Sequence, residues 1–321
     1  MSSNTFNSDS PEKKLKLKQL PPFLWEAAKL WASNRPWRMS AVVAYYAVLS
    51  LPGLLVIIVN MVGTIWGQEI IEGQISNQIS AAIGPKAAES VIAILQNSQS
   101  DDRTLFATIL GVGVLIFGAT GVFYHLQLSM NEIWNVKIDP KAGVIKVLKD
   151  RAISLAFIMV LVFLLIISLV ASTTLSVLNN YLSNLWKPAY IVLAQTIEIA
   201  ISTSVLGLLF VLIFKYMPDL KIQWKSVWLG GFLTAFLFNL GKLLLSFYFS
   251  QAEPGSTYGA AGSVVLILIW VSYSCLILFY GATFTKVLAE KLNHTISTKK
   301  QSLIVEEKEV VIERGSETSE D

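Results

Sequence analysis

The chain has 321 residues, of which 54% are hydrophobic and only 15% are charged, and its mean hydropathy is +0.58. A soluble globular domain typically carries about 25% charged residues, so the composition argues against that class and indicates an integral membrane protein. The single cysteine, Cys275, excludes an intramolecular disulfide framework and a multi-cysteine metal site.

Six apolar segments are long enough to cross about 30 Å of hydrocarbon, which takes roughly 20 helical residues. They lie near residues 40–65, 104–128, 152–178, 190–215, 227–250 and 261–288. Because their apolar residues surround each helix instead of forming a single stripe, they are typical of membrane spans. The sequence therefore predicts an all-α membrane protein whose six transmembrane helices fill a domain over residues 39–288.

The distribution of Lys and Arg predicts the orientation of these spans, because basic residues favour cytoplasmic loops. They concentrate before the first span, in the 129–151 and 215–226 loops and in the tail, whereas the other three loops hold only Lys86, Arg103 and Lys187. We therefore expect both termini in the cytoplasm. The first residues contain no apolar core followed by a small-residue cleavage site, so we expect the first span to act as the insertion signal.

Three segments outside the spans have recognisable patterns. In the cytoplasmic N-terminal segment, 1–38, the stretch "PPFLWEAAKLWASNRPW" gathers apolar residues on one face, which predicts a short amphipathic helix on the inner membrane surface. The outer loop, 68–100, reads as two amphipathic helical pieces broken at Gly84–Pro85, and the loop is net acidic. The tail, 289–321, is charged and cytoplasmic, and we expect its polar, acidic end to be disordered.

The fifth span, which includes "LGGFLTAFLFNLGKLLLSFYF", contains Asn239 and Lys242. We take Lys242 as the only Lys or Arg inside a span and Glu198, in the fourth span, as the only acid. Each lies about eight residues from the expected outer end of its helix, or ~12 Å deep. An unpaired charge at such depth costs from about 2.5 kcal/mol upward, so an intramembrane charged pair is by default a hypothesis of a functional site.

We predict that Glu198 and Lys242 pair across a polar cavity, with Gln195 and Asn239 supplying hydrogen bonds. Two structural alternatives remain open. The pair locks two helices together, or Lys242 extends its long side chain outward to the membrane surface.

Other residues in the spans indicate helix packing. Pro52 frees a carbonyl near Val48 in the first span, which predicts a kink where Ser50 or a neighbouring helix satisfies that carbonyl. At the start of the sixth span, Gly259 and Gly262 permit close approach of another helix.

Four stretches of the sequence form a recognisable pattern when they are taken together in this order, although none of them is diagnostic by itself. They are "AYYAVLSLPGLL", "LQLSMNEIWNVK", "YMPDLKIQWKSVWLGGFLTAFLFNLGKLLLSFYF" and "YGAAGSVVLILIWVSYSCLILFYGATFT". From about Trp25 to Leu288, the chain resembles the YihY/BrkB membrane proteins, formerly described as ribonuclease BN. The resemblance implies a six-helix fold with cytoplasmic termini in a bacterial plasma membrane. The family pattern often has Glu at the positions of Asn239 and Thr283, so we expect no mechanism that needs a carboxylate at either place.

Two functions from different classes fit these patterns. We favour a transporter, or a protein that handles lipid or small solutes, with its polar site between the fourth and fifth spans. The alternative is a non-transporting envelope scaffold whose outer loop binds a protein partner. Expected partners are membrane lipids and a solute, ion or lipid substrate, without nucleic acid. The chain has no G-x-x-x-x-G-K-[ST] motif, and we expect no cofactor and no metal site.

Ribonuclease activity is the least favoured interpretation. Phosphodiester hydrolysis needs a general acid and base or a carboxylate metal site. The two histidines, His125 and His294, have no closely spaced pattern of Asp or His around them, and topology already explains the basic loops. We therefore expect no catalytic residues.

Overall fold

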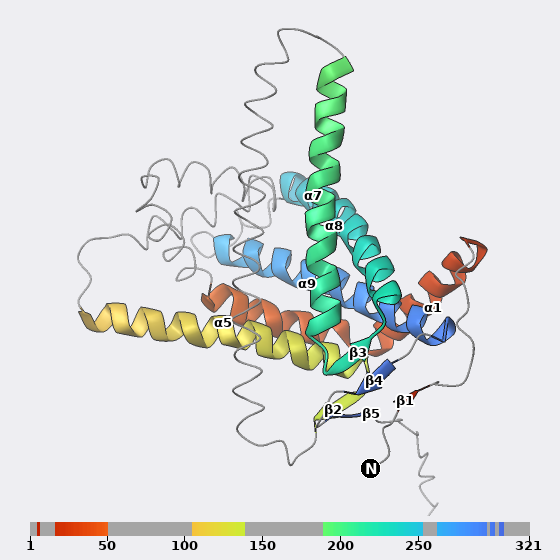
Figure 1. The fold of residues 1–321 in the computed structure, drawn as a ribbon. Helices are drawn as coiled ribbons and strands as arrows, with labels where there is room; N and C mark the ends of the chain where they lie inside the picture. The colour runs from red at the N-terminus through yellow and green to blue at the C-terminus, as the bar shows by residue number, and fades with distance from the viewer. Residues whose placement is uncertain are drawn as a thin grey trace, which may run out of the picture.

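A computed structural model describes residues 5–6, 17–50, 105–138, 189–252, 262–293, 296–298 and 302–304. Long α-helices dominate these ranges, and two small antiparallel sheets lie at one end of them (Figure 1). The helical content agrees with the all-α class predicted from the sequence. The expected third span, 152–178, and the outer loop, 68–100, lie outside the described residues.

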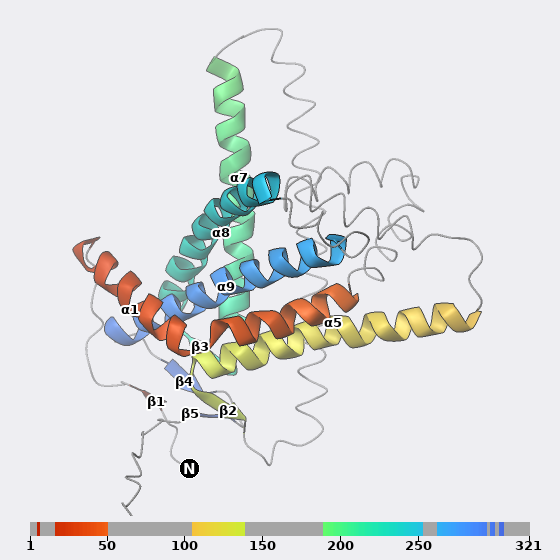
Figure 2. The ribbon, with the colours of Figure 1, turned by 180° about the vertical axis from the view of Figure 1, so that it is seen from behind.

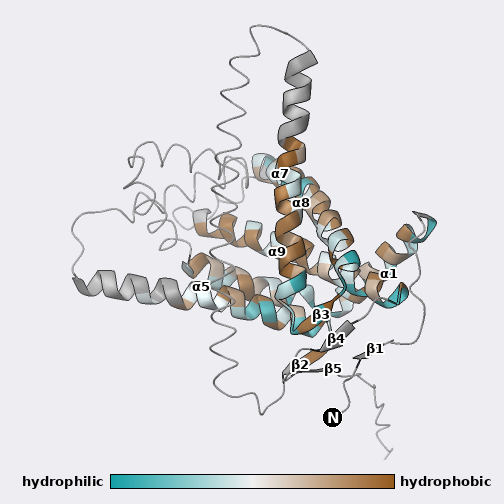
Figure 3. Cartoon of the chain, in the orientation of Figure 1, coloured by the Kyte–Doolittle hydropathy of each residue, from teal (hydrophilic) through white to brown (hydrophobic). Residues whose placement is uncertain are grey.

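The described helices overlap five of the six predicted spans, and the first of these, 40–65, is described only to residue 50. Residues 36–50 are helical, and the labelled helices are α5 (Leu105–Ile133), α7 (Ala189–Tyr216), α8 (Trp224–Ala252) and α9 (Gly262–Lys291). In the described part of the chain, three stretches are long and apolar enough to cross a membrane: Ile199–Tyr216, Trp224–Gln251 and Val264–Lys291. Hydrophobic residues predominate along α9 and along the coloured part of α7 (Figure 3). The structure thus supports spans four to six by length and composition.

The N-terminal segment contains the helix α1, Leu20–Ser33, where the sequence places a short helix. Its first turn holds two prolines, whose missing N–H groups cost no intrahelical hydrogen bond there. One face packs on α9: Ala27 is fully buried, and Tyr280 Oη donates a hydrogen bond to the Leu24 carbonyl at 3.1 Å. Trp25 is exposed. The apolar face that we predicted to lie on the membrane therefore contacts another helix, and the location of α1 on the membrane surface stays a prediction.

Asparagines stop two of the long helices. Asn135 follows α5 and Asn293 follows α9, each with a φ of 54°. Their N–H groups donate to the carbonyls of Glu132 at 3.1 Å and Glu290 at 3.3 Å. Asparagine tolerates this left-handed conformation better than most residues, so the sequence itself favours these two end points.

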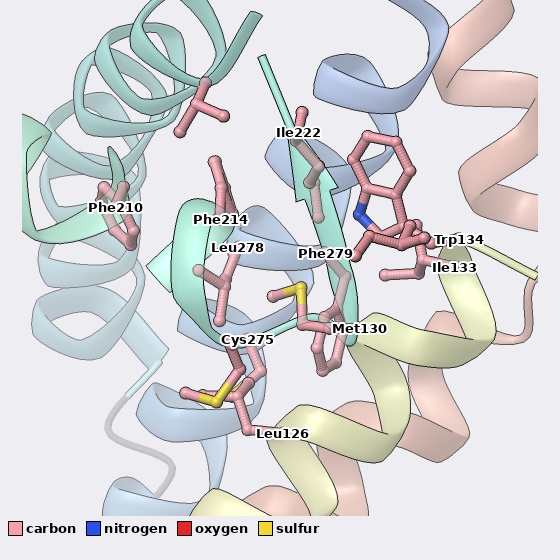
Figure 4. Close-up of a cluster of buried hydrophobic side chains, with 14 of the residues drawn as sticks. Leu126, Met130, Ile133, Trp134, Phe210, Phe214, Ile222, Cys275, Leu278 and Phe279 are labelled. Carbon is pink, nitrogen blue, oxygen red and sulfur yellow. The ribbon is translucent and has the colours of Figure 1, made fainter. Parts of the chain in front are cut away.

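A hydrophobic core joins helices that are far apart in the sequence. Figure 4 shows side chains from α5, α7 and α9 meeting around a short strand between α7 and α8. The labelled members are Leu126, Met130, Ile133, Trp134, Phe210, Phe214, Ile222, Cys275, Leu278 and Phe279. Cys275 is a buried free thiol in this cluster and acts there as a small apolar side chain.

Helices α8 and α9 approach closely at two reciprocal sites. A Cβ atom added to Gly230 would overlap Thr285 Oγ1, and one added to Gly281 would overlap Thr234 Oγ1. Each threonine hydroxyl donates to the glycine carbonyl one turn before it in its own helix, at 2.6 Å for Thr234 and 2.7 Å for Thr285. Each helix therefore inserts a threonine into the space that the other helix leaves at a glycine. Small residues of this kind allow the close packing that stabilises helix pairs in lipid.

Two three-residue strands attach the tail to the loops. β4 (Ile296–Thr298) pairs antiparallel with β3 (Leu220–Ile222), which connects α7 and α8, and with β1 (Thr5–Phe6). β5 (Ser302–Ile304) pairs antiparallel with β2 (Val136–Ile138), which follows α5.

The N-terminal segment, both basic loops and the start of the tail thus meet at one end of the helices (Figures 1 and 2). Their position at one end agrees with the single membrane face that the Lys and Arg distribution predicts for them. The strands were not predicted, and the acidic end of the tail lies outside the described residues.

This strand pairing predicts a specific cross-link. Lys221 on β3 lies directly opposite Ser297 on β4, and opposed residues in antiparallel strands have Cα atoms about 4.5–5.5 Å apart, within reach of a disulfide. In a Cys275→Ala background, Lys221→Cys with Ser297→Cys is expected to form a disulfide when purified membranes are oxidised. Mass spectrometry of unreduced peptides detects it. Lys221→Cys with Leu303→Cys joins two different sheets and serves as the control. Equal yields in the two proteins would contradict the pairing.

Candidate functional site

Asn239 on α8 makes a polar contact with α7. Its Nδ2 donates to Thr203 Oγ1 at 3.2 Å and to the Ala235 carbonyl of its own helix at 3.1 Å. Both Asn239 and Thr203 are partly buried. Around them, Phe236, which is 63% exposed, and other apolar side chains of α8 face outward, as expected next to lipid. The hydrogen bond therefore satisfies two polar groups that would be costly to leave unpaired in hydrocarbon.

Lys242 lies three residues after Asn239 and is partly buried. Because α7 and α8 are consecutive antiparallel helices, the contact between residues 239 and 203 places residue 242 level with about residue 200. Residue 198 precedes residue 200 by two positions, which is about 3 Å along the axis of α7. Glu198 and Gln195 belong to α7, but the structure does not describe their side chains. The ion pair between Glu198 and Lys242 stays a prediction.

The kink and packing residues are only partly described. Ser50 is buried, and its Oγ donates to the Ala47 carbonyl at 3.0 Å, in the turn that precedes it. A Cβ atom on Gly118 of α5 would lie 2.8 Å from the Ser50 backbone nitrogen, so α5 passes close to the first helix there. Gly262 is buried at the start of α9. Pro52 and Gly259 lie outside the described residues.

A buried polar pair joins α5 to the turn after α7. Asn131 Nδ2 donates to Asp219 Oδ2 at 2.9 Å, and the backbone N–H of Asp219 donates to Asn131 Oδ1 at 2.8 Å. Gln127 Nε2 lies 3.5 Å from the same Asp219 oxygen. Asn131 is 2% exposed and Asp219 is 6% exposed. The motifs "LQLSMNEIWNVK" and "YMPDLKIQW" therefore meet through this pair, whose partner Asp219 we did not identify from the sequence.

The prediction that Lys242 is the only lysine inside a span was wrong, because the candidate spans also contain Lys215, Lys225, Lys286 and Lys291. The buried one of these four is Lys286. It belongs to α9 and is 7% exposed. Its Nζ donates to the carbonyl of Ile133, the last residue of α5, at 2.9 Å. An ammonium group at a helix C-terminus satisfies a free carbonyl and interacts favourably with the helix dipole. Its position two residues before the expected end of the sixth span was the signal in the sequence.

A hollow of about 440 Å³ opens between α1 and the last turns of α9. This volume falls within the range of small-molecule sites. We call it the α1–α9 pocket, and its lining residues are Glu26, Lys29, Leu30, Ser33, Lys286, Val287 and Glu290. No pattern in the sequence indicates this pocket, because it exists only where α1 packs on α9.

His125 packs among aromatic rings. It stacks on Tyr46 with ring centroids 4.8 Å apart and an interplanar angle of 22°, and its edge contact with Tyr124 has centroids 5.2 Å apart. Across the described ranges, no three His, Cys, Asp or Glu side chains gather as a metal-binding group. His294 lies outside those ranges. These contacts are aromatic packing, and neither of them is with a carboxylate or a second histidine.

Comparison with known proteins finds its matches among membrane proteins of bacteria. A family model described as "Virulence factor BrkB" matches residues 30–303. The "UPF0761 membrane protein" of Saccharophagus degradans is 24% identical over 84% of this chain and 64% of its own length. The protein of the same name from Teredinibacter turnerae is 25% identical over 79% of this chain and 57% of its own length. The one from Pseudomonas aeruginosa is 26% identical over 79% of this chain and 60% of its own length. The chain therefore spans between 57% and 64% of the length of these three relatives. No solved structure matches it significantly.

Proposed function

Because this chain belongs to the Virulence factor BrkB family of membrane proteins, as its motifs suggested, we propose that it transports or otherwise handles a small solute or lipid in the bacterial plasma membrane. The site of this activity is the polar region between α7 and α8. Both termini lie in the cytoplasm, in line with the Lys and Arg distribution and with the strands β1, β4 and β5, which share sheets with the strands of the basic loops.

The hydrogen bond between Asn239 and Thr203 is the observation that supports this proposal. It puts an amide and a hydroxyl side by side within two apolar helices, one turn from the ammonium group of Lys242. Polar groups are expensive inside a membrane and commonly mark the path of a substrate or ion. A bond that merely locks the helices has the same geometry, so access of water to these residues decides between the two interpretations.

The proposed activity includes no ribonuclease reaction and no other catalytic step. His125, one of the two histidines, is engaged in stacking on Tyr46. The envelope-scaffold alternative depends on the outer loop, 68–100, which lies outside the described residues, so no observation favours it.

Cysteine labelling tests whether water reaches the site. In a Cys275→Ala background, we place single cysteines at positions 198, 203, 239 and 242 and add a membrane-impermeant maleimide to intact cells. A thiol reacts as its thiolate, which forms only in water. We expect labelling at these positions and none for Leu243→Cys, the matched control, because Leu243 neighbours Lys242 but is 65% exposed on the apolar surface.

If a substrate cavity is present, the cysteines at these positions are labelled more than the control cysteine at position 243. If cysteines at positions 203, 239 and 242 stay unlabelled from both membrane faces in folded protein, as Leu243→Cys does, the contact is a dry helix lock. That result would overturn the proposed site. Size-exclusion chromatography of each variant identifies folded protein.

A further inference from the structure

The α1–α9 pocket contains charged groups that neighbouring residues only partly neutralise. Glu26 forms a salt bridge with Lys291, with Nζ and Oε1 2.9 Å apart. Lys286 carries three N–H donors and uses one on the Ile133 carbonyl. Lys29 Nζ lies 5.5 Å from the centroid of the Trp25 ring. The pocket shares no lining residue with the polar site between α7 and α8, so a ligand here is independent of the proposed function.

Glu290 supplies the remaining charge of the pocket. It lies one turn after Lys286 on α9 and is exposed. Its carboxylate interacts electrostatically with Lys286 and Lys291 but forms no direct salt bridge with any described residue. With Glu26 paired to Lys291, the pocket offers two ammonium groups, on Lys29 and Lys286, and one carboxylate.

These three groups complement a small zwitterion. A phosphodiester accepts hydrogen bonds from two ammonium groups, and a primary ammonium donates hydrogen bonds to a carboxylate. A quaternary ammonium, by contrast, is recognised by aromatic faces, and the described lining of the pocket contains no aromatic ring. We propose that the α1–α9 pocket binds a phosphoethanolamine group, with its phosphate at Lys29 and Lys286 and its ammonium at Glu290.

The position of the pocket fits a headgroup at the membrane interface. Trp25 on α1 is 65% exposed and Trp37, in the next helix, is 68% exposed. Exposed tryptophans favour the level of lipid headgroups. Next to the charged groups of the pocket, α1 packs on Val287 and Leu288 of α9. The phosphoethanolamine group comes either from a membrane lipid or from a soluble ester, and the two sources are distinguished by experiment.

Binding to purified full-length protein tests the proposal. Native mass spectrometry in detergent measures the affinities of phosphatidylethanolamine, phosphatidylglycerol and phosphatidylcholine, with soluble glycerophosphoethanolamine as competitor. One charge-assisted hydrogen bond to the primary ammonium corresponds to about a tenfold preference for phosphatidylethanolamine over the other two lipids. Competition by the soluble ester at equal concentration identifies a soluble ligand, and resistance to it identifies the lipid. Both results support the site.

Substitutions test which residue binds the ammonium of the headgroup and which residue binds its phosphate. Glu290→Gln is expected to abolish the preference for phosphatidylethanolamine, because the carboxylate no longer pairs with the ammonium. Lys29→Gln is expected to weaken the binding of all three lipids severalfold, because the phosphate of each lipid loses one partner. Glu132→Gln and Lys221→Gln remove exposed charges outside the pocket and should change neither quantity. Lys286 stays unchanged in these tests because it also caps α5.

Two results would overturn the proposal. One is equal binding of the three lipids by the unaltered protein. The other is an unchanged preference in folded Glu290→Gln protein. Either result leaves the labelling of positions 239 and 242 unaffected, so failure of this site and failure of the α7–α8 site are separately visible.

Discussion

Gly281→Val is expected to lower the free energy of unfolding by about 3 kcal/mol, the upper end of the usual cost of overpacking a core. The reason is geometric, since even a Cβ atom at Gly281 would overlap the hydroxyl of Thr234 on α8. Thr234 is fully buried and β-branched, so its side chain has little room to move away. We expect thermal unfolding in detergent to record a fall in melting temperature on the order of 10 °C.

Gly113→Val is the matched control for this prediction. Gly113 also lies inside a long helix, α5, but a Cβ atom there meets no atom of the described residues within 4 Å. Comparing the two valine variants therefore separates the effect of packing from the effect of replacing a helical glycine. Equal falls in melting temperature would refute the close approach at Gly281.

A second comparison identifies the partner of Gly281. Gly281→Ala should be less damaging in a Thr234→Ala background, because that change removes Oγ1, the atom nearest the added methyl group, together with Cγ2. The Cβ of residue 234 remains 2.9 Å from it, so only part of the lost stability returns. If the two changes are simply additive, α8 and α9 do not meet at these residues.

The helices could be predicted from the sequence because the membrane imposes them. The N–H and C=O groups of a backbone in hydrocarbon must form hydrogen bonds with each other. An α-helix achieves this within a single segment, so a long apolar segment predicts a helix. The predicted spans 190–215, 227–250 and 261–288 accordingly lie within three residues, at each end, of α7 (Ala189–Tyr216), α8 (Trp224–Ala252) and α9 (Gly262–Lys291).

Contacts between helices could not be predicted in the same way. The pairing of Gly230 with Thr285 depends on which helices are neighbours and on their register, and a single sequence specifies neither. The short strands have the same origin, since β4 extends a sheet only where the tail reaches β3. Strands of three residues are also too short for a periodic pattern to identify.

Only one of the two residues that form the contact in the candidate site could be predicted from the sequence. Asn239 was conspicuous because an amide is rare in an apolar run, whereas its partner Thr203 resembles many other hydroxyl residues in spans. Lys286 was ambiguous because it lies close to the end of its span, and its burial follows from the contact with Ile133. A lysine near a helix end usually reaches the membrane surface, so burial could not be inferred from its position.

Asn131→Leu is expected to destabilise the protein by about 3 kcal/mol. The change preserves the approximate volume of the side chain but removes its hydrogen bonds of 2.9 and 2.8 Å with Asp219. A buried carboxylate that loses a partner retains the cost of its removal from water, which makes such a loss larger than the worth of the bond itself. Thermal unfolding in detergent measures the effect. Glu132→Gln, at the adjacent position, is the control, because its salt bridge to Arg38 is exposed and contributes at most about 1 kcal/mol.

The double variant Asn131→Leu with Asp219→Leu distinguishes the pair from a general requirement for polar residues at this end of the helices. Removing both side chains eliminates the carboxylate that has lost Asn131 as a partner, so the double variant should be less destabilised than the sum of the two single variants. The backbone N–H of residue 219 still lacks its acceptor, so full recovery is not expected. Recovery relative to that sum would mean that the two motifs are held together by this contact, whereas strict additivity would mean that each residue acts alone.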